Sequence, residues 1–340
     1  MCIPRITVIC PIYQERHFIG PLLDSLSAQD YPKDCMEVFL VDGMSQDGTR
    51  EYIAEYAHAH PFFRLVDNPM RTVPYALNKG ISQATGDIVI RIDAHCKYPT
   101  NYFSRLVHYL QELDADNVGG VCRTLPANGS TKALAIAQCL CHPFGVGGSD
   151  FRIGAHRVKQ VDTVPFGCFR RSLFDRIGLF DPELTRNQDD EFNGRIVKNG
   201  GKIFLIPDIV IEYAARDTIA KTRSMYWQYG LFKPLVNRKL GAPATVRQFF
   251  PLLFSLGVII GALLSLVSQY IAVAYAAVLI LYFLIGLLVG IGKAIEYKRW
   301  PLAVYMPYIF FNLHMSYGLG YLMGLYKVLM KKDWNVEVNR

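Results

Sequence analysis

The chain has 340 residues, 51% of them hydrophobic, and a formal net charge of +7, which suits one large or two ordinary domains. Its eight cysteines are scattered, with only Cys139 and Cys141 close together, which excludes a disulfide framework or a zinc-ligand spacing. Much of the positive excess lies just before a hydrophobic C-terminal region, whereas a nucleic-acid-binding domain would spread its basic residues over the globular part.

Four short apolar runs near the N-terminus predict β-strands. They are rich in β-branched residues and cover 6–10, 38–41, 63–66 and 88–92. Pro11 has no N–H to donate to a ladder, so we expect the first strand to end there. The first run is also too short for a secretory signal, which predicts that residues 1–240 stay in the cytoplasm.

Helical patterns separate these runs. Apolar spacing predicts helices over about 18–28 and 48–60, with Asp47 capping the second. Pro74 suits the first turn of a third helix that reaches Ala84. Strands and helices that alternate in this way predict an α/β fold with a doubly wound, mostly parallel sheet.

Polar side chains follow three of the predicted strands: Tyr13 and Glu15 after the first, Asp42 after the second, and Asp93 and His95 after the fourth. The carboxyl ends of parallel strands share one edge of a sheet, so we expect these residues to converge on one ligand-binding crevice. The first strand is not followed by G-x-G-x-x-G and the chain has no Walker-type loop, which argues against dinucleotide and ATP binding.

Asp93 and His95 form a candidate metal site. Residues two positions apart on an extended backbone project to the same side, and a carboxylate with an imidazole suits Mn²⁺ or Mg²⁺. A metal would then neutralise bound phosphates in place of a glycine-rich loop. The alternative is that Asp93 caps a turn at the strand end and that His95 is merely solvated.

Three adjacent acids, Asp189, Asp190 and Glu191, open a predicted helix farther along the chain. An acid at a helix N-terminus complements the helix dipole, which accounts for one of them. Three together, in a chain that already offers a metal-binding edge, indicate a carboxylate that acts as a base.

The C-terminal third is expected to be embedded in a membrane. Residues 249–292 contain no Asp, Glu, Lys or Arg, and a crossing needs about 20 apolar residues, so this stretch predicts two spans. Residues 301–326 also lack these four charges, although polar residues and glycines dilute the pattern. A buried helical bundle of a soluble protein is the alternative.

Residues 214–248, just before the first span, carry seven basic side chains and one acidic one among aromatic residues. This pattern predicts an interfacial segment on the cytoplasmic face. We expect a cytoplasmic catalytic domain at 1–213 and the basic aromatic segment at 214–248. Transmembrane helices follow at 249–330 (about 249–268, 271–292 and 302–326), and a tail at 331–340. The loop 293–300 and the tail are both basic, which would require the third segment to re-enter or to lie in the interface. Its 26 residues nevertheless suffice for a full crossing, and we expect three spans.

Several motifs together resemble the family 2 glycosyltransferases of GT-A (nucleotide-diphospho-sugar transferase) fold, over roughly residues 5–240. They are Pro11-Ile12-Tyr13-Gln14-Glu15, Val41-Asp42-Gly43 with Ser45, Asp47, Gly48 and Thr49, and the segment from Asn68-Pro69 to Ala76-Leu77-Asn78-Lys79-Gly80. Asp93-Ala94-His95 replaces the usual Asp-x-Asp and Gln188-Asp189 the usual Glu-Asp. These departures, with 161–167, 186–191 and Tyr229-Gly230, resemble the succinoglycan-type glucosyltransferases of bacterial exopolysaccharide biosynthesis.

The resemblance implies an inverting, metal-dependent hexosyltransferase at the inner (cytoplasmic) membrane. It would pass one sugar from a UDP-sugar, most simply UDP-glucose, to a lipid-linked saccharide. Mn²⁺ or Mg²⁺ would bind at Asp93 and His95, and Asp189 would be the catalytic base, with Asp190 or Glu191 as the substitute. The residues implied for the donor are Pro11, Tyr13, Glu15, Asp42, Arg71, Asn78, Lys79 and Asp93.

Two other functions stay open. A polyprenyl-phosphate glycosyltransferase would pass the sugar onto the lipid phosphate itself, which needs no strong base because that oxygen is already anionic. A non-catalytic membrane protein that binds nucleotide sugars would use the same site without turnover. Processive synthesis is not expected, because the Gln-x-x-Arg-Trp signature is absent and Tyr226-Trp227-Gln228-Tyr229-Gly230 occupies that region.

Overall fold

The computed structural model describes residues 3–243 and 245–334 and divides the chain into two compact units. The first contains Met1–Arg123 with Gly154–Tyr213, and the second contains Thr124–Ile153 with Ala214–Arg340. The chain passes between the two units after Arg123, Ile153 and Tyr213. Residues 335–340 of the expected tail lie outside the described residues.

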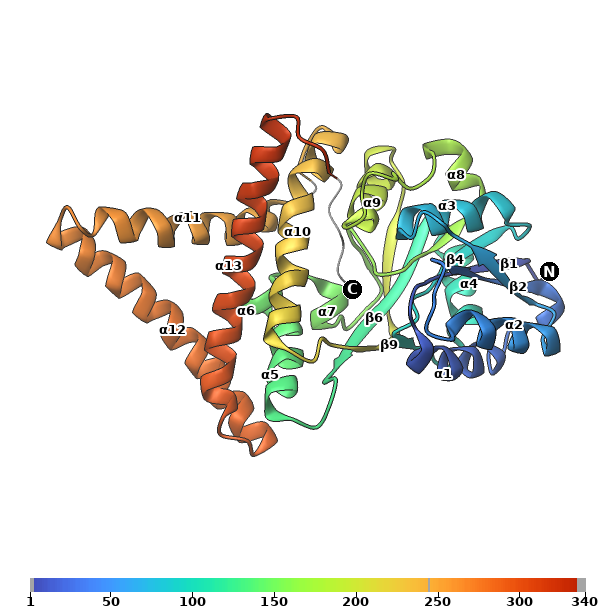
Figure 1. Ribbon diagram of the computed structural model, residues 1–340, viewed down its shortest axis with the longest axis horizontal. Helices are drawn as coiled ribbons and strands as arrows, with labels where there is room; N and C mark the ends of the chain where they lie inside the picture. Colours follow the sequence, from blue (N-terminus) through green and yellow to red (C-terminus); the bar gives the residue numbers. More distant parts are fainter. Residues whose placement is uncertain (1–2, 244, 335–340) are drawn as a thin grey trace. The chain divides into compact units, whose positions relative to one another are not determined.

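The first unit is built on one mixed sheet (Figure 1). Its strands are, in spatial order, β3 (Phe63–Asp67), β2 (Met36–Asp42), β1 (Ile6–Ile12), β4 (Ile88–Arg91), β8 (Cys168–Arg170), β6 (Asn117–Leu125), β9 (Ile203–Ala214) and β5 (Cys96–Lys97), with β7 (Lys159–Gln160) paired to β9. The four predicted strands form and pair in parallel, as expected. The pairings of β8 with β4 and β6, and of β9 with β5 and β7, are antiparallel.

Helices cover both faces of this sheet (Figure 1). They are α1 (Arg16–Ser27), α2 (Thr49–Ala59), α3 (Val73–Gln83), α4 (Tyr102–Glu112), α8 (Ser172–Ile177) and α9 (Gln188–Lys198), with a 3₁₀ turn at Lys33–Cys35. Side chains alternate along a strand, so Val8 faces the core under α1 and α4 while Ile9 faces α3. Gly80 of α3 lies so close to Ile9 that an added Cβ would approach its side chain to 2.7 Å.

The first strand does not end at Pro11, as the sequence suggested, but continues to Ile12. Pairing with β4 stops at Ile9–Arg91, and Ile12 bonds toward β2 through its carbonyl. Because alternate residues of a strand bond to opposite sides, the nitrogen of Pro11 points to the side where β4 has already ended. The missing N–H therefore interrupts no ladder hydrogen bond.

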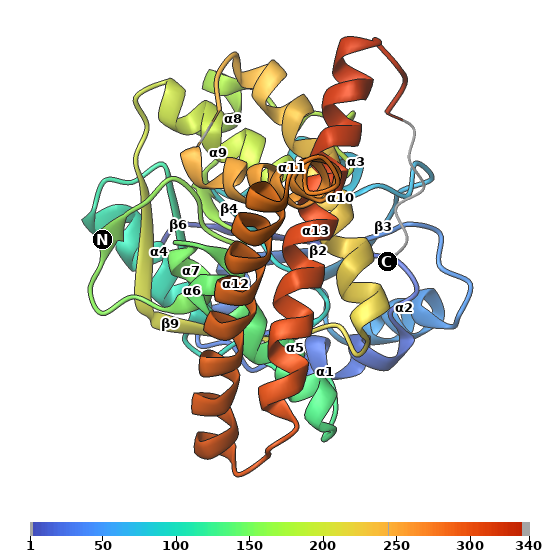
Figure 2. The same cartoon turned by 90° about the vertical axis from the view of Figure 1, so that its left-hand side faces the viewer.

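The second unit is helical. It contains α5 (Thr131–Leu140), α6 (Pro143–Val146), α7 (Asp150–Ile153), α10 (Ile219–Leu240), α11 (Phe249–Leu264), α12 (Gln269–Tyr297) and α13 (Leu302–Leu329), with a 3₁₀ turn at Val246–Gln248. Helices α10 and α13 lie side by side (Figures 1 and 2). Glycines make this contact close: a Cβ on Gly320 would lie 2.2 Å from the Trp227 carbonyl oxygen, and one on Gly230 would lie 2.0 Å from that of Tyr317. Small residues that let helix backbones approach are typical of packing within membranes.

Two helices of the described chain are long and apolar enough to cross a membrane: Val246–Leu264 and Gln269–Tyr297. Their apolar side chains are largely exposed, with Leu266 and Val267 more than four-fifths exposed in the link between them. The third hydrophobic segment forms α13, but much of it is buried, and Met306, Ile309 and Phe310 join the core of the second unit. The aromatic segment 214–248 forms α10, whose Met225 and Tyr226 belong to the same core.

Candidate active site

The loops after β1 and β2 are tied into one structure at the carboxyl ends of these strands. Three successive backbone N–H groups of the first loop donate to side chains of the second: Gln14 to Ser45 Oγ at 2.8 Å, Glu15 to Thr49 Oγ1 at 3.0 Å and Arg16 to Asp47 Oδ2 at 3.1 Å. Burial raises the pKa of Asp47, but hydrogen bonds from Thr49 and Arg16 outweigh it and lower the pKa overall. The carboxylate therefore stays charged and holds both loops.

Asp42 lies beneath these loops, fully buried at the end of β2. Its carboxylate accepts the Ser45 N–H at 2.9 Å, the Ser45 hydroxyl at 2.5 Å and Nη1 of Arg50 at 2.8 Å. The second Nη of Arg50 contacts Asp67, at the end of the neighbouring β3, at 2.7 Å. The carboxylates of Asp67 and Asp42 raise the pKa of Arg50. Sequence reasoning missed this arginine, which holds the ends of two strands together.

Tyr13 and Arg71 lie side by side, with the Arg71 guanidinium 5.8 Å from the centre of the tyrosine ring. Gly43 leaves room for that ring, because a Cβ there would approach its Cδ2 atom to 3.0 Å. Arg71 is exposed and has a positive φ of 58°, which a non-glycine residue rarely adopts. An aromatic ring beside an exposed cation is an arrangement that can bind a base and an adjoining phosphate.

The amide of Asn78 is used within the protein. Its Nδ2 donates to the Phe180 carbonyl oxygen at 2.7 Å, and its Oδ1 accepts the Phe180 N–H at 3.0 Å. These two hydrogen bonds join α3 to the segment before α9, so Asn78 has a structural role next to the site. Lys79 is half-buried next to it, and Pro11 is buried within β1.

The expected extended geometry at Asp93 and His95 is wrong. Strand β4 ends at Arg91, and Asp93-Ala94-His95 forms a turn in which Asp93 Oδ1 accepts the His95 N–H at 3.2 Å. The alternative, an aspartate capping a turn, describes this backbone. His95 is not merely solvated, because its Nε2 lies 2.9 Å from Oε1 of the buried Glu15 and its ring meets Phe18 edge-on at 4.9 Å.

The carboxylates of Glu15 and Asp93 and the imidazole of His95 thus lie at this turn. Their atom types suit Mn²⁺ or Mg²⁺, but within the described residues no three His, Cys, Asp or Glu side chains are arranged to hold a metal ion. Mg²⁺ is commonly bound by one or two carboxylates together with substrate phosphates. The residues present therefore fit a cation that shares its coordination with a bound diphosphate.

Asp189 stands at the start of α9 and forms an ion pair through its Oδ1 with Nη1 of Arg91. The Arg91 side chain is 7% exposed and that of Asp189 is 32% exposed. Burial lowers the pKa of Arg91, and the charge of Asp93 opposes this shift. The arginine keeps its charge at neutral pH in either case. Asp189 therefore pairs directly with a guanidinium whose charge Asp93 also favours.

The two substitute bases differ in their surroundings. Glu191 is buried and accepts Nε of Arg195 at 2.6 Å and Nη2 at 2.9 Å. The same arginine donates to the carbonyl oxygens of Ile177 and Leu179, both at 2.7 Å. Glu191 is thus fixed in a structural ion pair, while Asp190 is half-buried beside Asp189.

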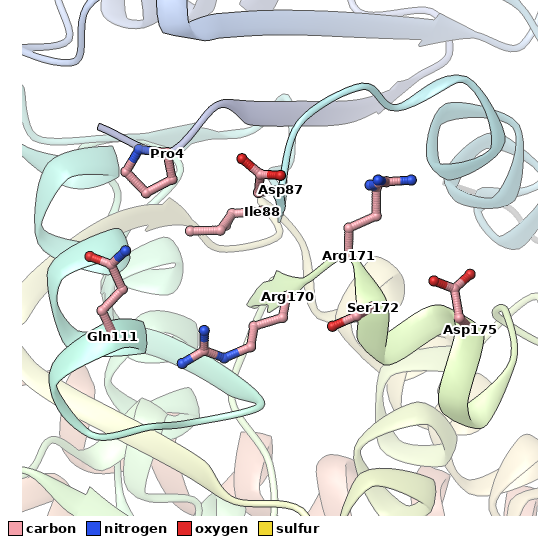
Figure 3. Close-up of a pocket in the computed structure, with 8 residues that line it drawn as sticks. All are labelled: Pro4, Asp87, Ile88, Gln111, Arg170, Arg171, Ser172 and Asp175. Atoms are coloured by element: carbon pink, nitrogen blue, oxygen red, sulfur yellow. The ribbon is translucent and has the colours of Figure 1, made fainter. Parts of the chain in front are cut away.

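A separate hollow lies at the other edge of the sheet (Figure 3). It is lined by Pro4, Asp87, Ile88, Gln111, Arg170, Arg171, Ser172 and Asp175. Pro4 and Asp87 precede β1 and β4, so this hollow is at the amino ends of the parallel strands, opposite Asp42 and Asp93. It is not the crevice that the sequence predicted.

Comparison with known proteins agrees with this architecture. The model of the family "Glycosyl transferase family 2" matches residues 7–178. A dolichyl N-acetyl-alpha-D-glucosaminyl phosphate 3-beta-D-2,3-diacetamido-2,3-dideoxy-beta-D-glucuronosyltransferase of Methanococcus voltae is 28% identical over 95% of this chain and 97% of its own length. The succinoglycan biosynthesis protein ExoA of Rhizobium meliloti is 29% identical, over 92% of this chain and 93% of its own length.

Among solved structures, the mannosyltransferase PcManGT of Pyrobaculum calidifontis, in complex with GDP-Man and Mn²⁺, has a TM-score of 0.61. It is 23% identical, and the match covers 98% of this chain and 89% of that one, which shows the GT-A fold. The similarity to ExoA confirms the predicted resemblance to succinoglycan-type enzymes. The motifs, the fold and a family match over half of the sequence agree, and the chain belongs to glycosyl transferase family 2.

Proposed function

We propose that this protein is a membrane-anchored, inverting glycosyltransferase that moves one sugar from a UDP-sugar, most simply UDP-glucose, to a lipid-linked saccharide. The observation that carries the proposal is the ion pair of Asp189 with Arg91, which ends the strand that leads into Asp93, in the unit that also holds the tied loops after β1 and β2. A donor-binding carboxylate and a base are thereby offered to one reacting centre. The Methanococcus voltae relative is named for transfer to a dolichyl-linked sugar, which supports the acceptor class.

Donor binding is assigned to the two ends of this crevice. Tyr13, Glu15 and Asp42, supported by Pro11 and Asn78, would hold the nucleoside, with Arg71 and Lys79 near the diphosphate. Asp93 would hold Mn²⁺ or Mg²⁺ together with diphosphate oxygens. His95, whose imidazole pairs with Glu15, would lie beside the ion. When bound, the cation would supply positive charge that stabilises the departing UDP. The manganese complex of the Pyrobaculum enzyme supports a divalent ion.

Asp189 would accept the proton of the acceptor hydroxyl. That oxygen forms a bond to the anomeric carbon on the face opposite the diphosphate, and the old carbon–oxygen bond breaks with its electron pair leaving on UDP. Attack from the opposite face inverts the anomeric configuration. The Asp189 side chain is 32% exposed, which leaves the carboxylate accessible, and it lies against the Arg91 guanidinium.

The test is transfer by membranes that contain the full chain, supplied with a panel of labelled UDP-sugars and lipid extracts. Asp189→Asn should keep UDP-sugar binding and lose about 10²–10⁴-fold in transfer, the usual contribution of a positioned base. Asp190→Asn, one residue along the same helix, tests the substitute base: it should retain transfer if Asp189 is the base, and a loss confined to Asp190→Asn would move the role to Asp190.

Near-normal turnover by Asp189→Asn would show that the base is assigned wrongly. If the labelled product were then the sugar on polyprenyl phosphate itself, the protein would be a polyprenyl-phosphate glycosyltransferase. UDP-sugar binding without any product from the unchanged chain would overturn the enzymatic function.

A further inference from the structure

Arg91 is a charged residue inside an otherwise apolar strand. It is the last residue of β4, between Ile90 and Ile92, which are both fully buried. Burying a guanidinium is expensive unless a carboxylate pairs with it. Among the described residues neither its Nε nor its Nη1 has a hydrogen-bond partner, and Asp189 is the carboxylate with which Nη1 forms an ion pair.

The guanidinium is held from below by a strained loop. The backbone N–H of Arg91 donates to the Gly167 carbonyl oxygen at 3.0 Å. The guanidinium carbon of Arg91 lies 5.8 Å from the centre of the Phe166 ring. Phe166 has a φ of 64° and Gly167 a φ of 90°. Glycine adopts such angles readily, but a non-glycine residue such as Phe166 keeps them only where its surroundings enforce them, most often at functional sites.

Those surroundings include the helix that carries Asp189. Asn193, one turn along α9, bonds Asn117 at 2.8 Å and the Thr163 hydroxyl at 2.8 Å. Asn117 in turn accepts the Cys168 N–H at 3.1 Å. The loop under the guanidinium and the helix that bears the base are therefore joined by one buried network.

Arg91 is poorly placed to bind the donor itself. It is 7% exposed, and Nη1 already faces Asp189. Arg71, which is exposed and lies beside Tyr13, has the character expected of a diphosphate contact. The remaining task for Arg91 is to fix the side chain with which it pairs.

We propose that Arg91 is a positioning residue for transfer: it fixes the orientation of the Asp189 carboxylate and touches neither the donor nor the acceptor. This inference rests on the proposed function, in which Asp189 is the base. A reacting group displaced by about 1 Å can cost about 100-fold in rate, so loss of the guanidinium should lower kcat. The KM for the donor should stay within about threefold, because the interaction is not part of donor binding.

The experiment is a double-mutant cycle in the full chain, with kcat, donor KM and UDP binding measured for Arg91→Met, Asp189→Asn and the two together. We expect Arg91→Met to lose about 100-fold in kcat and the double variant to be no slower than Asp189→Asn, because residues that act as a unit are not additive. Arg91→Lys keeps the charge without the planar fork and should recover part of the loss. The double variant removes both charges together, which keeps the cycle measurable if Arg91→Met alone folds poorly.

Three outcomes would overturn the inference. A higher donor KM with unchanged kcat in Arg91→Met would make Arg91 a donor contact. Full activity of Arg91→Met would show that Arg91 has no role in transfer. Losses that multiply in the double variant would show that Arg91 acts independently of Asp189. Normal turnover by Asp189→Asn alone is a different failure, which would disprove the base assignment of the proposed function.

Discussion

Arg50 joins two carboxylates that would otherwise repel each other. Asp42 and Asp67 end neighbouring parallel strands at paired positions, and one guanidinium contacts both. Asp42 is fully buried, and its carboxylate is held by this arginine and by Ser45. Arg50 thus fixes the strand ends at which we propose that the nucleotide binds, as Arg91 is proposed to fix the base.

Replacing Arg50 by Met should weaken donor binding and leave the chemical step intact. An unpaired buried Asp42 would shift the loops after β1 and β2, so we expect the donor KM to rise about tenfold or more, which corresponds to about 1.4 kcal/mol, with kcat within about threefold. Calorimetric titration with UDP measures the same loss.

Arg64→Met is the matched control for this prediction. Arg64 lies on β3, is exposed and contacts the Phe39 ring at 5.8 Å, away from the two carboxylates. It should leave both kinetic constants unchanged. A lower kcat with an unaltered UDP affinity in Arg50→Met would contradict this division of roles.

Single residues show where sequence reasoning succeeds and where it fails. Asp42 and Asp93 follow continuous buried runs, and a strand that ends in a carboxylate can be recognised without the structure. His95 was misplaced because the alternation of a strand was extended into a turn. Arg91 was visible as a charge within a buried run, but its partner lies on a helix far along the chain, and only tertiary structure shows the pair.

At the scale of elements, the parallel half of the sheet was predictable and the antiparallel half was not. The first four strands are complete apolar runs separated by helical patterns. Strands β5, β7 and β8 have two or three residues each, too few for a periodic pattern, and their pairing joins distant segments such as Cys96 with Tyr213. Such short strands form because the neighbouring strand provides a template.

The contact of α10 with α13 depends on glycine at Gly230, Gly320 and Gly324, and Gly320→Ala tests it. The added Cβ would lie 2.2 Å from the Trp227 carbonyl oxygen, so the two backbones must separate. Overpacking of this kind costs about 1–3 kcal/mol. We expect a lower midpoint of thermal unfolding in detergent, measured by tryptophan fluorescence.

Gly257→Ala is the control for this prediction, because a Cβ at Gly257 would meet no atom within 4 Å. Its helix, α11, should gain slightly from the better helix propensity of alanine. Equal unfolding midpoints for the two variants would show that the close approach of α10 and α13 is not needed for stability.

At the scale of the whole molecule, the question is which helices face lipid. Helices α11 and α12 carry exposed apolar side chains over their length, while α13 is packed along α10 and does not qualify as a span by hydropathy. The loop 293–300 and the segment from Lys327 to Lys332 are both basic. Positive charge favours the cytoplasmic side for both, which an even number of crossings satisfies and three crossings do not.

We therefore expect the C-terminus to lie on the same side of the membrane as the catalytic unit. A fluorescent protein fused after Arg340 should fluoresce, and alkaline phosphatase fused at the same point should be inactive, because the first folds in the cytoplasm and the second requires export. Phosphatase fused after Ser268, in the link between α11 and α12, should be active if these helices cross. Activity at Arg340 would instead mean that α13 crosses as a third span, and inactivity at both points would mean that α11 and α12 enter and leave the bilayer on one side. The first two patterns assign different membrane roles to α13, and its packing against α10 predicts the first of them.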